Sequence, residues 1–244
     1  MKLKRAAALA VAGAALALML TGCGPAIVRV EDPARTDAPA VDLGAAKALD
    51  AELRIGVGTL RVSGGTGRAM EARFDYRPES WKPGVRYSVE GTTGELLVEQ
   101  PQPQCAFGNG RNEWDVRLND SVPLTLSVKT GVGKSTLDLG DLRLRRLDVV
   151  GGVGETTVDL GRVAREDVTV DIRGGVGLIV VRVPRGAAVR LGGDPEGIGE
   201  FRARGFTRSS SENALVNESY GTPGAKRYDI RVQRGIGDVI VEQQ

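Results

Sequence analysis

Residues 124–140 read LTLSVKTGVGKSTLDLG, and this stretch contains the unit that decides the fold. At its centre lies Gly131-Val132-Gly133. The same Gly-X-Gly pattern, with Val or Ile at X, returns at 56–58, 152–154, 175–177, 197–199 and 235–237. In the second half of the chain the central residues are 21, 23, 22 and 38 positions apart. A sustained period near 22 residues is typical of a solenoid, in which each turn of the chain stacks on the previous one.

Apolar and polar residues alternate on both sides of each Gly-X-Gly. Aligned on the glycines, Leu, Val or Ile occupies positions 126 and 128, 147 and 149, 170 and 172, 230 and 232 before the bend, and 137 and 139, 158 and 160, 181 and 183 after it. A period of two residues indicates strands. Each repeat is therefore predicted to be a strand, a glycine bend and a second strand, and the chain to be all-β. Because one such unit buries too little surface to be stable alone, we expect a β-solenoid over residues 119–244.

The region 44–118 has one copy of the pattern, and we interpret it as an N-terminal β subdomain. Strands are expected at Met70–Tyr76, Val85–Val89 and Leu96–Glu99. Trp81 and Trp114 are interpreted as packing residues, since large aromatic side chains are mostly buried.

The N-terminus carries the features of an exported lipoprotein. Three positive charges precede the apolar run of residues 6–20, which ends at Leu20-Thr21-Gly22-Cys23. The run is shorter than the ~20 residues that span a bilayer, so residues 1–22 are predicted to be a signal peptide that ends in a lipobox. Cys23 is the predicted lipid attachment site, and residues 23–43 are expected to form a flexible tether.

Composition excludes several kinds of chemistry. The chain contains no His and two Cys, so Ser-His-Asp triads, His-ligated metals and disulfide frameworks are ruled out. With 33 Lys+Arg against 31 Asp+Glu, it lacks the basic surplus of a nucleic-acid-binding protein. Cys105, the second thiol, is interpreted as a small apolar side chain. We predict no catalytic residue, no cofactor and no metal, and hence no enzyme.

Two other motifs suggest ligands on first inspection. Gly131 to Thr136 resembles the end of a phosphate-binding loop, but Val128 stands where the full pattern needs a glycine. Gly151 to Gly154 resembles a calcium-binding glycine-rich repeat, but Thr156 stands where the ligand Asp belongs. Both are better explained as copies of the structural repeat.

The period breaks between Ile198 and Ile236, where about 16 extra residues fall within 206–226. Insertions in solenoids form loops on one face, and such loops often bind partners. This segment is expected either to cap the last turn or to be a binding loop, with Tyr220 and Asn217 as its predicted contact residues.

The sequence resembles the toast-rack family, whose folded part also occurs outside the membrane in LiaF-type regulators of the cell-envelope stress response. The resemblance lies in Asn119-Asp120, the repeated Gly-Val-Gly, Leu137-Asp138-Leu139-Gly140 with its counterpart at 158–161, and Asn217-Glu218-Ser219-Tyr220-Gly221. It implies a β-solenoid without catalytic residues. A lipobox replaces the membrane helices of the LiaF type, which argues against direct control of a membrane kinase.

These features together predict a non-catalytic binding or scaffold module of the cell envelope, with a role in stress sensing as one possibility. A structural or adhesive surface protein is the first alternative and an envelope hydrolase the second. The lipid on Cys23 would hold the protein at the outer face of the cytoplasmic membrane, or at the outer membrane of a diderm host. Its partner would be an envelope protein or the cell wall, while the oligomeric state is left open.

Overall fold

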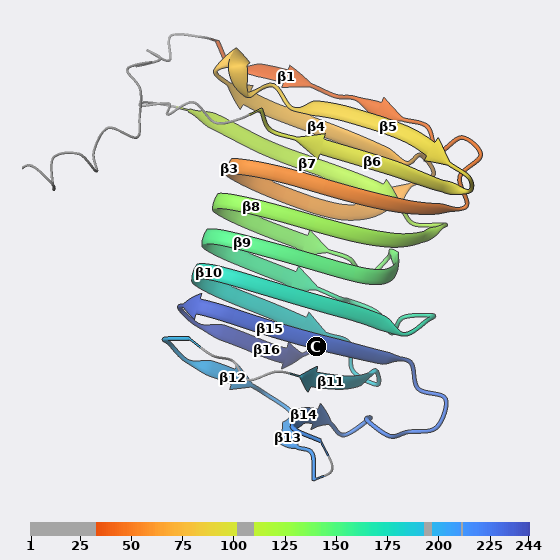
Figure 1. Ribbon diagram of the computed structural model, residues 1–244, viewed down its shortest axis with the longest axis vertical. Coiled ribbons are helices and arrows are strands. Elements are labelled where there is room, and N and C mark those ends of the chain that lie inside the picture. Colours follow the sequence, from red (N-terminus) through yellow and green to blue (C-terminus); the bar gives the residue numbers. More distant parts are fainter. Residues whose placement is uncertain (1–32, 102–109, 193–196, 211) are drawn as a thin grey trace, which may run out of the picture.

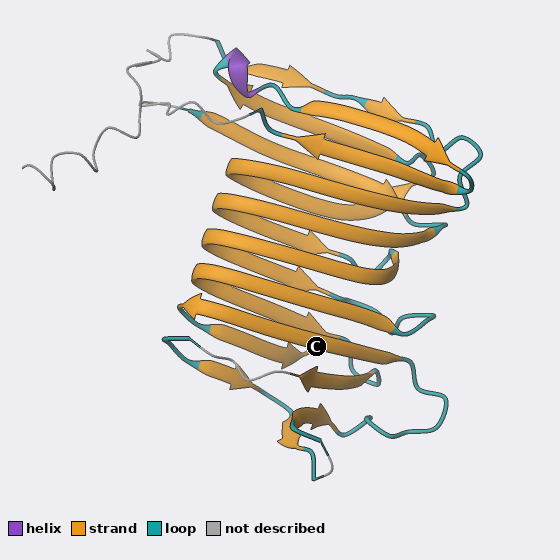
Figure 2. Cartoon of the chain, viewed as in Figure 1, coloured by secondary structure: helices purple, strands orange, loops and turns teal. Residues whose placement is uncertain are grey.

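The computed structural model describes residues 33–101, 110–192, 197–210 and 212–244. Within these ranges the one helical element is a 3-10 helix, η2 (Glu79–Trp81), and all other regular structure is strand (Figure 2). No helix among the described residues has the length and apolarity needed to cross a membrane. The strands are β1 (Arg35–Asp37), β2 (Ala40–Val41), β3 (Ala48–Thr66), β4 (Met70–Arg77), β5 (Gly84–Glu90), β6 (Thr93–Glu99), β7 (Arg111–Asn119), β8 (Pro123–Asp138), β9 (Arg143–Asp159), β10 (Val168–Val183), β11 (Ala188–Gly192), β12 (Phe201–Ala203), β13 (Phe206–Arg208), β14 (Ala214–Asn217), β15 (Arg227–Ile236) and β16 (Val239–Gln243).

The four longest strands bend at their Gly-X-Gly and so build two faces. β3, β8, β9 and β10 each run along one face, turn at the bend and return along the other (Figure 1). Their first halves form a parallel ladder with β6 at one end and with β15 and β11 at the other. Their second halves form a parallel ladder with β7, β16 and β12. The predicted all-β solenoid is confirmed.

The register of the turns follows the apolar alternation. The ladder joins Leu126 to Leu147, Leu147 to Val170, and Val170 to Ile230. All four side chains are fully buried between the two faces. Because side chains alternate between the two sides of a strand, the polar residues between them lie on the outer surface. The predicted inside and outside positions of the repeats are therefore correct.

Glycine at the bends is required by the closeness of neighbouring turns. Gly154 has φ +140°, and a Cβ added to it would lie 1.8 Å from the carbonyl oxygen of Gly133. The same 1.8 Å contact recurs for Gly133 on Gly58, for Gly177 on Gly154 and for Gly237 on Gly177. No side chain fits there, so the repeat can be built only with glycine at this position.

The solenoid begins earlier than the sequence analysis expected. β3 pairs in parallel with β8 over both of its halves, with Val57 opposite Val132. Residues 48–66 are thus a complete turn of the stack and not part of a separate subdomain. The sequence pattern did not reveal this turn, because residues 67–118, which include β4 to β7, lie between it and the next turn and interrupt the 22-residue period.

The last two turns exchange places in the stack. β10 pairs with β15 and β16, near the C-terminus, whereas β11 and β12, which follow β10 in the sequence, pair with the far side of β15 and β16. The bend at 235–237 therefore lies directly on the bend at 175–177, and the bend at 197–199 lies beyond it. The 38-residue spacing is the path of the chain to the end of the stack and back, and not one loop inserted between consecutive turns.

Buried aromatic and amide side chains close the other end of the stack. Trp81 and Trp114 are both buried, as predicted, and Trp114 packs on Phe74 with ring centroids 5.2 Å apart. The amide oxygen of Gln100 accepts hydrogen bonds from the N–H groups of Gly56 and Val57, and Asn112 Nδ2 donates to the carbonyl oxygen of Val57 at 2.6 Å. These amides take the place of a preceding turn. They supply the hydrogen-bond partners for two N–H groups and one carbonyl oxygen of the first bend.

Candidate binding surfaces

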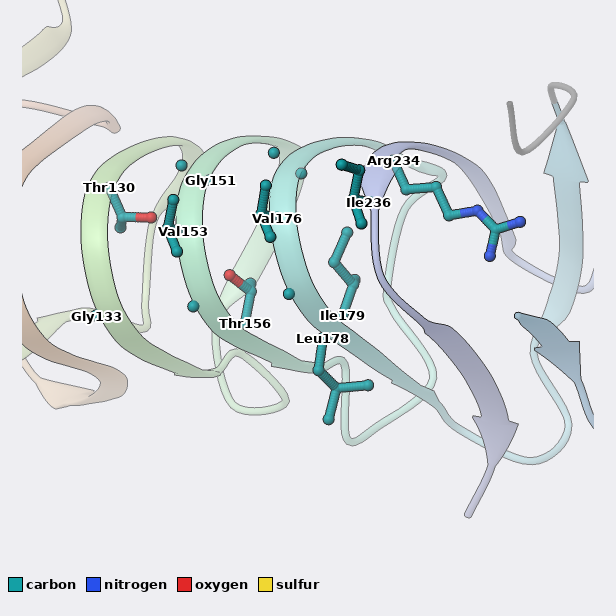
Figure 3. Close-up of a pocket in the computed structure, with 15 residues that line it drawn as sticks. Thr130, Gly133, Gly151, Val153, Thr156, Val176, Leu178, Ile179, Arg234 and Ile236 are labelled. Atoms are coloured by element: carbon teal, nitrogen blue, oxygen red, sulfur yellow. The ribbon is translucent and has the colours of Figure 1, made fainter. Parts of the chain in front are cut away.

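A single row of apolar side chains runs along the bent edge of the stack. Each residue of the row is the centre of one Gly-X-Gly, and its neighbours in the row are its register partners. Figure 3 shows three of them on successive turns. In stack order this apolar row consists of Val57, Val132, Val153, Val176, Ile236 and Ile198.

Five of the six side chains of the apolar row are exposed to solvent, and Val57 is half-buried. Val132, Val153, Val176 and Ile236 have exposed fractions of 45–52%, and Ile198 reaches 71%. These five make up most of the eight large apolar side chains that are exposed in the described residues. Scattered exposed valines are ordinary, whereas a continuous array of them is a candidate interaction surface.

Beside the row, Lys134 lies on the outer surface and forms an ion pair with Glu155 of the next turn, with Nζ 3.1 Å from a carboxylate oxygen. The glycines that precede Lys134 pack against backbone of the neighbouring turn. Residues 132–136 pair with β3 on one side and β9 on the other, which agrees with the interpretation of Gly131 to Thr136 as a copy of the structural repeat.

Charged side chains form ladders on the outer surface of the first-half face. Glu52 accepts hydrogen bonds from Arg54 of its own strand at 2.8 and 2.7 Å and pairs with Lys129 of the next turn at 2.7 Å. The bonds from Arg54, together with Lys129, lower the pKa of Glu52 to about 2. Glu52 thus connects two cationic side chains, and both favour its ionised form.

A shallow groove beside β5 carries more acidic than basic side chains. It is lined by residues of β3, β5, β6 and β8, among them Asp50, Glu90 and Glu95. Burial raises the pKa of Glu95, and the charges of Asp50 and Glu90 raise it further. The groove is therefore acidic. No group of three or more potential metal-ligating side chains occurs among the residues that the structure describes.

The segment 206–226 lies at the end of the stack. It contains β13 and β14, and β14 pairs with β11 in antiparallel fashion. Tyr220 is half-buried, and its hydroxyl donates to Glu212 at 3.1 Å. Glu212 in turn accepts from Arg190 of β11, which also pairs with Asp229 at 3.1 Å. Burial, and then the bond to Glu212, raise the pKa of the Tyr220 hydroxyl. The segment thus caps the stack, and contact of Tyr220 with a partner stays a prediction.

Asn217 occupies a structural position, and its interpretation as a contact residue needs correction. Its side chain is 4% exposed. Oδ1 accepts from the N–H of Val189 at 2.9 Å, and Nδ2 donates to the carbonyl oxygen of Ala187 at 2.7 Å. Because the amide is buried inside the cap and bonded there at both ends, the Asn217 side chain is not on the surface that a partner would contact. Cys23 and Cys105 lie outside the described residues.

The apolar row was missed by the sequence analysis. The signal was present, since every X of the six Gly-X-Gly copies is Val or Ile. The two flanking glycines pack against the backbone of the neighbouring turn, which leaves no space there for a side chain. The side chain of the residue between them therefore faces the solvent.

The comparisons with known proteins agree with this architecture. A family model for the N-terminal domain of toast-rack proteins, DUF2154, matches residues 30–182. The match covers more than half of the chain and crosses the boundary predicted at 118/119, and the chain therefore belongs to the toast-rack family. No curated protein matches the sequence.

Solved structures give a second comparison. A candidate cell adhesion protein from Clostridium sporogenes is 28% identical, with a TM-score of 0.78, over 87% of this chain and 100% of its own. Candidate adhesins from Bacteroides fragilis and Parabacteroides distasonis are 14% and 12% identical, with TM-scores of 0.25 and 0.28. They cover 87% and 88% of this chain and 99% and 98% of their own. The Clostridium protein shares the architecture along its whole length.

Proposed function

We propose that this protein is a lipid-anchored, extracytoplasmic binding or scaffold module of the cell envelope. The observation that carries the proposal is the stack itself, which presents one continuous apolar row along its edge. Such a surface suits contact with another macromolecule more than turnover of a small substrate, because it is long, narrow and open. The likeness to the candidate cell adhesion protein supports a surface role.

The anchor is the lipid on Cys23, placed there by processing at Leu20-Thr21-Gly22-Cys23. The folded part would then stand at the outer face of the cytoplasmic membrane, or at the outer membrane in a diderm host. β1 and β2 fall within the tether predicted over 23–43 and pair with β4, so that prediction is wrong from Arg35 onward and the tether is shorter. From Cys23 to the first described residue, Pro33, the chain spans at most ~35 Å. The membrane would thus lie near the β1 end of the stack.

Two roles are compatible with such a module. Toast-rack membership favours a part in sensing envelope stress, as in LiaF-type regulators. The 28% identity to the candidate cell adhesion protein favours adhesion as the second candidate. A hydrolase has less support, since the carboxylates described above are held in ion pairs on the surface or gathered in an open groove.

Metabolic labelling with a radioactive fatty acid tests the anchor. We expect label in the wild-type protein, and in Cys23→Ala neither label nor removal of residues 1–22. Cys105→Ser is the matched control and should be labelled like the wild type. Equal labelling of wild type and Cys23→Ala would contradict the lipoprotein assignment.

A deletion strain separates the two roles. For a sensor, loss of the gene changes the transcriptional response to an agent that damages the envelope and leaves attachment to surfaces unchanged. For an adhesin, attachment falls and the transcriptional response stays the same. If neither changes, both roles are wrong.

A further inference from the structure

We infer that the apolar row is a self-association surface, on which two copies anchored in the same membrane pack side by side. The inference rests on the lipid anchor proposed above and adds the partner of the module. Successive turns are about 4.8 Å apart, so the six side chains from Val57 to Ile198 extend over roughly 24 Å.

A second copy matches this row because it carries the same spacing. When a two-fold axis runs parallel to the stack, each residue of the row faces its own equivalent, and the contact repeats at every turn. The glycines on both sides of each apolar residue have no side chains, so the row stands clear of its surroundings. Val132, Val153 and Val176 then approach their equivalents without displacing a neighbour.

The anchor supplies the orientation that this symmetry requires. β1 and β13 lie at opposite ends of the stack (Figure 1). The tether reaches at most ~35 Å, so chains anchored through Cys23 keep their β1 ends near the membrane, and we take the stacks to stand upright on it. Two neighbouring copies are therefore parallel, and a two-fold axis along the membrane normal relates them.

The size of the row argues for a partner held in the same membrane. Burial of the exposed parts of six aliphatic side chains removes roughly 200–400 Å² per copy from water. A stable complex in solution buries about 800 Å² per partner. The row is too small to hold two freely diffusing molecules together, but a shared membrane raises their effective concentration and allows a weak contact to form.

Cysteine cross-linking of the full chain in native membranes tests this inference. The variant is Val153→Cys in a Cys105→Ser background, treated with a mild oxidant and analysed on a non-reducing gel. A two-fold axis places the two introduced thiols opposite each other, so we expect a cross-linked dimer. The matched control is Arg61→Cys in the same background, exposed on the second half of β3 and away from the apolar row, where we expect at least tenfold less dimer.

A second variant tests the contact itself. Val176→Glu, added to Val153→Cys, places two carboxylates against each other on the two-fold axis and should reduce the dimer at least tenfold. Val176 is 45% exposed in the single chain, so resistance to protease should be unchanged. After replacement of residues 1–23 by a cleavable signal for soluble export, Val153→Cys should stay monomeric at micromolar concentration.

Fatty-acid label, measured on the same samples, separates the two proposals. Label without dimer at Val153→Cys overturns self-association and leaves the anchor in place. Loss of label overturns the anchor, and this inference with it. Equal dimer at Val153→Cys and Arg61→Cys means random collision and overturns the inference. A cross-linked band at the mass of a different protein assigns the row to another partner.

Discussion

The bend glycines provide the sharpest test of the stacked fold, and Gly154→Ala is the substitution of choice. Two separate effects are expected. The φ of +140° lies in a region that residues with a Cβ avoid, at a cost of about 1–3 kcal/mol. In addition, the new Cβ would lie 1.8 Å from the carbonyl oxygen of Gly133, which belongs to the backbone of the preceding turn, so the backbone of one turn must shift.

The expected loss of stability follows from the hydrogen bonds that break when the two turns move apart. Relief of the overlap separates the turns at the bend and breaks two or three ladder hydrogen bonds, each worth about 1 kcal/mol. Together with the strain at φ, we expect Gly154→Ala to lower the free energy of unfolding by about 3–6 kcal/mol.

A matched control isolates the overlap from the strain. Gly186 also has a positive φ, +83°, but no atom lies within 4 Å of an added Cβ. Gly186→Ala should therefore cost only about 1–2 kcal/mol. Urea denaturation followed by circular dichroism measures both variants. Equal losses of stability in the two would refute the argument that contact between stacked turns fixes these glycines.

Three further changes have defined outcomes. Val158→Asp places a carboxylate at a fully buried site and should cost several kcal/mol in urea denaturation, about 3–5, whereas Lys134→Ala, which removes an exposed ion pair, should stay within about 0.5 kcal/mol. Asn217→Ala leaves a buried N–H and a buried carbonyl unpaired and should lower stability by about 1–3 kcal/mol in thermal or urea unfolding; a neutral result would show that the cap does not depend on this amide. The folded-state pKa of Glu52 is lowered from 4.5 to about 2, so its contribution to stability is complete above about pH 4.5 and is lost as the pH falls toward 2. Glu52→Gln should flatten the dependence of stability on pH in this window, and an unchanged profile would contradict the assignment.

The repeat and its buried positions could be predicted from the sequence because the physical requirement is local. Every turn needs glycine where Gly133 and Gly154 meet, and apolar residues at alternate positions such as Leu126 and Leu147. These requirements recur at each turn, so a short sequence pattern is enough to predict the stacked fold. The turn at 48–66 was not recognised because an insertion of four strands follows it, and periodicity detects only consecutive copies.

The order of the turns could not be predicted from periodicity. The bends at 197–199 and 235–237 are equivalent as sequence patterns, and either would fit on the bend at 175–177. Long-range pairing decides between them, since the return of the chain through β13 and β14 allows the C-terminal turn to lie inside the stack with both of its edges paired.

The candidate site was predicted only in part for a related reason. Tyr220 and Asn217 were chosen because they lie where the period breaks, yet a break identifies an end of the stack as readily as a binding loop. Asn217 is buried because β14 ends there and the backbone at the start of β11, at Ala187 and Val189, needs a donor and an acceptor. The apolar row, in contrast, lies within the regular repeat, where no irregularity draws attention to it.

The apolar row exists as one continuous surface only if the turns stack in the order described, and a disulfide measures that order most directly. Arg182 and Glu242 are register partners on neighbouring strands, and adjacent strands are about 4.8 Å apart, within the reach of a disulfide. In a stack that followed the sequence order, Arg182 would neighbour Arg204 instead, because Arg204 follows the bend centre Ile198 at the same distance as Arg182 follows Val176. In a Cys105→Ser background, we predict efficient oxidation of the pair Arg182→Cys and Glu242→Cys and none of the pair Arg182→Cys and Arg204→Cys. The opposite result would contradict the exchanged turns and the continuous row.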